Sequence, residues 1–139
     1  MTRGLQTLAL VAALLTGCRD TTSPESVAGT YELDSVGSQA LPVVLHSEPN
    51  YSFEIAASTV TLDPNGTFGE TFVYNVNDAG AMFTQANVCT GSWAKSGNAL
   101  TLQEAAPGAC GALNTATWDG RDVLTITSPR FASPAVYKR

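Results

Sequence analysis

The sequence predicts an all-β protein, a small antiparallel up-and-down barrel of about eight strands. After residue 27, apolar and polar residues alternate at period two, and no segment has convincing helical periodicity. Threonine, valine, isoleucine and aromatic residues, which favour strands, are frequent there. Short segments rich in glycine, asparagine or proline separate the alternating runs, as hairpin turns do.

Composition limits the function classes. The 139 residues are 44% hydrophobic and 14% charged, which suits one globular domain. The net charge is −5 and no lysine or arginine cluster is present, which argues against a nucleic-acid partner. A single histidine and the absence of repeated Cys/His spacing argue against a zinc site. We therefore expect no metal and no cofactor.

Residues 1–17 have the pattern of a signal peptide. Arg3 supplies a positive charge, and an apolar stretch runs from Leu5 to Leu15, too short for the ~20 residues of a membrane-spanning helix. Leu15-Thr16-Gly17-Cys18 follows directly and resembles the bacterial lipobox, whose cysteine is diacylated and becomes the mature N-terminus. The alternative is an ordinary secretory signal followed by a chance cysteine.

Acylation of Cys18 predicts a lipid-anchored protein of the bacterial cell envelope. Two acyl chains such as palmitate hold a protein on a membrane stably. Residues 18–27 then form the lipidated cysteine and a polar tether, and residues 28–139 form the barrel domain. Loss of Arg3 leaves 6 basic and 12 acidic residues, a net charge of −6. Arg19 does not resemble an inner-membrane retention signal, which favours the outer membrane.

Two cysteines, Cys89 and Cys110, remain in an oxidising compartment, where disulfides persist. We expect them to pair. Two buried free thiols or a reactive pair are the alternatives. No Cys-x-x-Cys motif is present, so a thioredoxin-like redox role has no support.

The strands are expected in order along residues 28–139. Pro42 lies in the second and makes it an edge or irregular strand. The fourth places Phe68, Phe72, Tyr74 and Val76 on one face. The expected strands are Gly29–Ser35, Leu41–His46, Phe53–Asp63, Thr67–Val76, Phe83–Lys95, Ala99–Gln103, Ala112–Asp119, Asp122–Thr127 and Ala135–Arg139.

A weak internal repeat supports two of the hairpins. Trp93 and Trp118 are each followed by a glycine-containing turn and then by Leu-Thr-Leu or Leu-Thr-Ile. Each copy has the pattern of an aromatic strand, a turn and an alternating strand. A duplicated hairpin within a meander explains the repeat.

Turn length suggests where a pocket would open. The segments around residues 37, 65, 97 and 120 are tight, whereas the connections at 46–52, 77–82 and 103–111 look longer. In an up-and-down meander, alternate turns lie at the same end. The long connections would therefore surround the mouth of a pocket.

The segment Gly29-Thr30-Tyr31-Glu32-Leu33-Asp34-Ser35-Val36, continuing to Leu41-Pro42, resembles the opening of small lipocalin-like bacterial lipoproteins. Val60–Phe68 and Val136–Arg139 match the same pattern. The sequence has Gly37-Ser38 where the family pattern has Asn-Gly, so the first turn departs from it. The resemblance implies a barrel of about eight strands and no catalytic residues.

No constellation of residues indicates catalysis, and we expect no enzyme. His46 is the one histidine, and no Gly-x-Ser-x-Gly elbow would present a nucleophile. Four carboxylates, Glu54, Glu70, Asp78 and Glu104, are scattered over separate strands and connections, and nothing favours a glycosidase pair among them.

The aromatic residues suggest a binding role. An eight-stranded barrel is either filled by its side chains or holds one small ligand. The leading hypothesis is a membrane-tethered lipocalin-like barrel that binds a small apolar ligand, and the alternative is an interaction module such as an envelope-anchored inhibitor of an exogenous hydrolase. The candidate ligand-binding residues are Phe68, Phe72, Tyr74, Met82, Phe83, Trp93 and Trp118.

Overall fold

The computed structural model describes residues 26–106 and 114–139. These residues form ten strands and no helix, which confirms the all-β prediction. The strands are β1 (Gly29–Val36), β2 (Gln39–Ala40), β3 (Val43–Glu48), β4 (Tyr51–Leu62), β5 (Thr67–Asp78), β6 (Ala81–Ser96), β7 (Ala99–Glu104), β8 (Asn114–Trp118), β9 (Val123–Thr127) and β10 (Ala135–Lys138).

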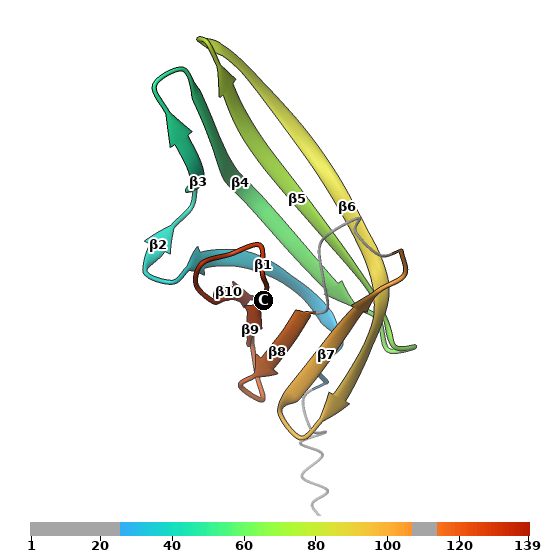
Figure 1. The fold of residues 1–139 in the computed structure, drawn as a ribbon. Helices are drawn as coiled ribbons and strands as arrows, with labels where there is room; N and C mark the ends of the chain where they lie inside the picture. Colours follow the sequence, from blue (N-terminus) through green and yellow to red (C-terminus); the bar gives the residue numbers. More distant parts are fainter. Residues whose placement is uncertain (1–25, 107–113) are drawn as a thin grey trace, which may run out of the picture.

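Eight of these strands close into an antiparallel barrel, as predicted. From β4 to β10 each strand pairs with the next along the chain, and β1 closes the ring by pairing with both β10 and β4. The two extra strands, β2 and β3, pair only with β1 and β4 respectively among the described residues. The barrel is an up-and-down meander whose ring is visible in the lower part of Figure 1.

A β-bulge keeps the apolar residues of β4 on the inner face. Phe53 and Ile55 alternate on odd positions, whereas Ser58, Val60 and Leu62 alternate on even ones. The register with β5 shifts between residues 55 and 57, so one extra residue reverses the phase of the alternation. Both halves of the strand therefore face the same side.

The strands β3 to β6 continue past the ring as a projecting sheet (Figure 1). We call this part the sheet extension and define it as residues 43–48, 51–57, 72–78 and 81–88. Its strands end in two tight hairpins, because only two residues separate β3 from β4 and β5 from β6. The sequence prediction of long connections at 46–52 and 77–82 is therefore wrong, since most of these residues belong to strands.

The barrel interior is packed with side chains from all eight barrel strands. Tyr31, Leu124 and Tyr137 are completely buried there. Gly91 is required by this packing: a Cβ at this position would collide with the backbone carbonyl of Gln103 and approach the Phe68 ring to 2.6 Å. The middle of the barrel is therefore a filled core rather than an open channel.

The two hairpins that contain tryptophan are present as predicted. Trp93 on β6 donates an indole hydrogen bond of 3.0 Å to the carbonyl of Asp63, and Trp118 on β8 donates one of 3.1 Å to Arg121. Each ring thus ties its strand to a nearby turn. Their polar atoms are committed to structural contacts.

Candidate functional site

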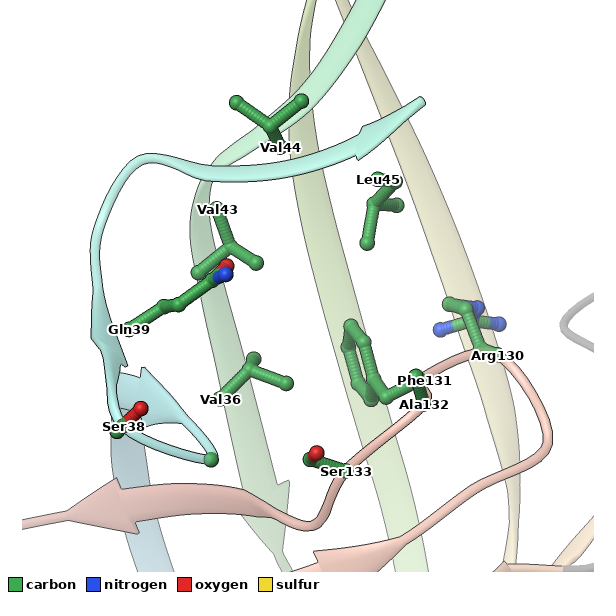
Figure 2. A pocket seen from close by; sticks show the side chains of 11 residues that line it. Val36, Ser38, Gln39, Val43, Val44, Leu45, Arg130, Phe131, Ala132 and Ser133 are labelled. Carbon is green, nitrogen blue, oxygen red and sulfur yellow. The ribbon is translucent and has the colours of Figure 1, made fainter. Parts of the chain in front are cut away.

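A cavity of about 350 Å³ opens at one end of the barrel. It lies between the β1–β2 hairpin, the start of β3 and the loop that joins β9 to β10. Figure 2 shows Val36, Val43, Leu45 and Phe131 gathered around it, with Arg130 on the loop beside them. The remaining lining residues are Gly37, Ser38, Gln39, Val44, Ala132 and Ser133. Apolar side chains and polar groups both contribute to the lining, in comparable shares.

Arg130 joins the cavity to the barrel interior. Its guanidinium carbon lies 3.9 Å from the centroid of the Phe72 ring, a cation–π contact. Its Nη1 atom lies 3.9 Å from Oε2 of Glu70, whose side chain is almost fully buried. One cationic side chain therefore lines the cavity and also faces the carboxylate beneath it.

Beneath the cavity, the barrel encloses a polar cluster of Ser58, Glu70, Arg130 and Tyr137. The Tyr137 hydroxyl donates a hydrogen bond of 2.9 Å to Oε1 of Glu70. The Ser58 hydroxyl lies 3.1 Å from the Tyr137 oxygen. Because the single Tyr137 proton is given to the carboxylate, Ser58 is the donor in this second bond. Glu70 is thus contacted from β10 and the β9–β10 loop, and Ser58 on β4 is linked to it through the Tyr137 hydroxyl.

Burial raises the pKa of Glu70 from 4.5 to about 7. The Tyr137 hydrogen bond and the charge of Arg130 oppose the increase, and the charge of Glu104 adds to it. Burial also raises the pKa of Tyr137 well above its usual value, with the Glu70 charge adding to the effect. The cluster therefore holds one carboxyl group that titrates close to neutral pH.

A row of aromatic rings leads from the cavity along β5 to β4. Phe131 contacts Phe72 at 6.3 Å between ring centroids, and Phe72 is stacked on Tyr74 at 5.8 Å. Tyr74 is in turn stacked on Phe53 at 4.7 Å. The rings come from the β9–β10 loop, β5 and β4, so this row of buried and partly buried rings crosses three elements.

The predicted ligand-binding residues are spread over three places. Phe68, Phe72, Tyr74 and Trp118 are buried in the core, and Trp93 packs against it while half-buried. Met82 and Phe83 are exposed on β6 at the tip of the sheet extension. None of the seven lines the cavity, although Phe72 and Tyr74 belong to the aromatic row beside it.

Phe68 lines a second hollow of about 680 Å³, together with residues of β5, β6 and β7. This hollow is more open and includes Gly69, Gly91 and Gln103. We place the candidate site at the first cavity, because it is the more enclosed of the two.

The predicted cysteine and histidine sites are only partly covered by the structure. Cys89 is buried in the barrel core on β6, whereas Cys18 and Cys110 lie outside the described residues. The disulfide and the lipidation site therefore stay predictions. His46 lies on β3 with its Nε2 atom 3.1 Å from Glu48, and both side chains are exposed. No described contact links His46 to a nucleophile.

Sequence reasoning did not select the two residues that connect the cavity to the core. Glu70 was predicted only as one of several scattered carboxylates. A signal for it exists, since Glu70 occupies an even position of β5 among buried Phe68, Phe72 and Tyr74. Arg130 lies in a loop, where no sequence periodicity indicates which way a side chain points. Only the tertiary structure therefore places it.

Among the described residues, no helix is long and apolar enough to cross a membrane. Comparison of the sequence with models of known protein families and with curated proteins finds no match.

Proposed function

We propose that the protein is a lipid-anchored lipoprotein of the bacterial cell envelope whose lipocalin-like barrel binds a small, mainly apolar ligand in the cavity between β1, β3 and the β9–β10 loop. The observation that carries this proposal is the cavity itself. Its volume of about 350 Å³ is within the range of small-molecule sites, and its lining combines apolar side chains with polar groups that could orient a ligand. Val36, Val43, Leu45 and Phe131 would supply the walls, and Arg130 the polar group.

The filled barrel interior limits how deeply a ligand could enter. Tyr31, Phe72 and Tyr137 are at most 1% exposed, so a ligand would not enter the middle of the barrel. It would occupy the mouth, with one side against Phe131 and the other toward solvent. This differs from a deep calyx and implies a ligand of modest size.

The place where the described chain begins supports a role away from the membrane. Ser26 and Ala28, at the start of the described chain, are held by Nη1 of Arg139 at 2.9 Å and 3.3 Å. They precede the first residue of β1, whereas Val36, its last residue, lines the cavity. Eight strand residues span about 26 Å. An anchor at Cys18 would therefore leave the cavity at the far end of the barrel.

A cavity-filling substitution tests the proposal. Ala132 is exposed and lines the cavity, so Ala132→Trp should occupy the space without disturbing the core. Ala94→Trp, on the exposed outer face of β6, is the matched control. Binding of the fluorescent probe 1-anilinonaphthalene-8-sulfonate to the folded protein is expected to weaken at least tenfold in Ala132→Trp only.

Native mass spectrometry of the protein purified from its own envelope provides the second measurement. A retained small molecule that is absent from Ala132→Trp supports the proposal. Equal probe binding by both tryptophan variants, with no retained molecule, contradicts it. A stoichiometric foreign protein in place of a small molecule would favour the inhibitor of an exogenous hydrolase, the alternative that the sequence left open.

A further inference from the structure

The first eight residues of β6 form a strand edge that no other described strand covers. Residues 91–96 of this strand pair with β7, but residues 81–88 pair only with β5 among the described residues. All eight side chains are exposed. Met82 and Val88 are 67% and 66% exposed, the largest values among the exposed apolar side chains of the described chain.

The direction of the backbone groups on this edge follows from the turn before it. The two-residue turn has positive φ at both central residues, so its flanking pair, Asp78 and Ala81, is hydrogen-bonded. Hydrogen-bonded and non-hydrogen-bonded pairs then alternate along the two strands. Even-numbered residues of β6 therefore direct their N–H and C=O groups away from β5. The bond of 3.0 Å from the Ala105 nitrogen to the Thr90 oxygen, on the β7 side, agrees with this. Within 81–88, the even residues therefore present unpaired backbone groups.

Soluble proteins normally protect such edges with charge, proline, bulges or very short strands. The other two edges of this sheet follow that rule. The β3 edge carries His46 and Glu48 and has a bulge, and β2 is only two residues long. Residues 81–88 contain no charged residue, no proline and no bulge. This edge therefore lacks the features that normally prevent pairing with another strand.

The sequence of the edge is complementary to itself about Gln85. In an antiparallel pairing of two copies across a two-fold axis at Gln85, Met82 of one copy lies opposite Val88 of the other. Thr84 likewise lies opposite Ala86. The pairs 82/88 and 84/86 join even residues, which are the ones with outward N–H and C=O groups, so the hydrogen-bond alternation is satisfied. The register thus brings the most exposed apolar side chains together on one face.

We propose that the protein forms a two-fold homodimer through antiparallel pairing of β6 residues 82–88, centred on Gln85. The chain has a net charge of −5, and an uncharged edge is where two such copies can approach without direct repulsion. An extended segment of another protein could use the same backbone groups. Only a second copy satisfies the two-fold register in which Met82 and Val88 are opposed. This inference is independent of ligand binding at the cavity.

Cysteine cross-linking of the full chain in detergent tests the register. Gln85 would face its own copy in a non-hydrogen-bonded pair with a Cα separation of about 4.5 Å, which a disulfide can bridge. Gln85→Cys is therefore expected to give a covalent dimer on mild oxidation. Asn87→Cys lies on the same face, but its two copies would be about 13 Å apart and should not cross-link. The wild-type chain shows how much cross-linking the natural cysteines give by themselves.

Introducing positive charges into the proposed interface tests it independently of the cross-linking. Met82→Lys combined with Val88→Lys would place lysines opposite each other in the dimer, while both are exposed in the monomer. The double variant should sediment as a monomer, whereas wild type and Val44→Lys, a control on exposed β3, should sediment as dimers. Far-UV circular dichroism checks that all of them fold.

Two outcomes would overturn the proposal. One is a wild-type chain that remains monomeric up to its solubility limit and gives no Gln85→Cys cross-link. The other is a Gln85→Cys cross-link to a different polypeptide, which would make this edge a docking strand for a foreign partner. Equal cross-linking at Gln85→Cys and Asn87→Cys would also contradict the stated register.

Discussion

Replacing Glu70 by glutamine is expected to remove most of the pH dependence of stability between pH 5 and pH 8. In the folded protein this carboxyl has a pKa of about 7, because it is buried, while its ordinary value is 4.5. The folded state therefore binds the proton more tightly than the unfolded chain does. The contribution of Glu70 to stability is greatest below pH 4.5, falls as the pH rises, and levels off above pH 7.

The pKa difference sets the magnitude of the effect. Between 4.5 and about 7, it corresponds to about 3 kcal/mol of unfolding free energy lost on ionisation. Arg130 and Tyr137 already reduce this loss, by charge and by hydrogen bonding respectively. A glutamine resembles the protonated side chain, and its amide oxygen can still accept the Tyr137 hydroxyl proton. Glu70→Gln should therefore match wild type near pH 5 and exceed its stability at pH 8.

Urea unfolding at pH 5, 6, 7 and 8, at constant ionic strength, measures this directly. Trp93 and Trp118 provide the fluorescence signal. Other shifted carboxyls titrate outside this interval: hydrogen bonds from Lys138 to Asp34, and from the backbone of Val123 to Asp119, lower their pKa values below 3.8. Their contributions are lost only in acid.

A matched control separates Glu70 from the general effect of removing a carboxylate. Glu32 is exposed on the outer face of β1, so Glu32→Gln should retain the wild-type pH dependence. The reasoning fails if wild-type stability is constant or increases from pH 5 to pH 8. It also fails if Glu70→Gln loses stability as steeply as Glu32→Gln does.

Three further predictions concern the barrel wall and the cysteines. Gly91→Ala should lower the unfolding free energy by about 1–3 kcal/mol in urea titration, because its Cβ collides with the facing strand, whereas Gly69→Ala has open space and should change it by less than about 0.5 kcal/mol. Equal effects of the two would contradict the packing at Gly91. Radiolabelled palmitate should label the wild-type chain and not Cys18→Ala; an unlabelled wild type, or label that survives the substitution, would refute lipidation there. Reductant should lower the melting temperature of wild type through loss of about 3 kcal/mol, and should not affect the Cys89→Ser, Cys110→Ser double variant; an identical response would argue against the disulfide.

Alternation along the chain was sufficient to predict the strands of the barrel. Phe68, Phe72, Tyr74 and Val76 share one face of β5 in the structure as they do in the sequence, since strand side chains repeat with period two. The same rule failed for β4, where its two halves are out of phase. A bulge at residues 55–57 restores the common face, and a bulge leaves no local signal in this sequence.

The ends of strands were harder to predict than their faces. Pro49-Asn50 and Ala79-Gly80 were assigned to longer loops, yet the flanking residues continue as strands to a two-residue turn. The strand expected at Phe83–Lys95 begins two residues earlier, at Ala81, and its first eight residues are exposed on both faces. Backbone pairing with β5, rather than side-chain burial, holds them in place.

The sequence alone determined the strand content, the inner face of most strands and the expectation of a lipid anchor, because all three depend on local patterns. Only the tertiary structure decided where a cavity opens, and it placed that cavity between β1, β3 and the loop of Arg130 rather than among the expected loops. It also revealed that Glu70 is enclosed by Ser58, Tyr137 and Arg130, residues 12 to 67 positions away. Burial and charge proximity depend on closing the barrel, which brings distant strands together.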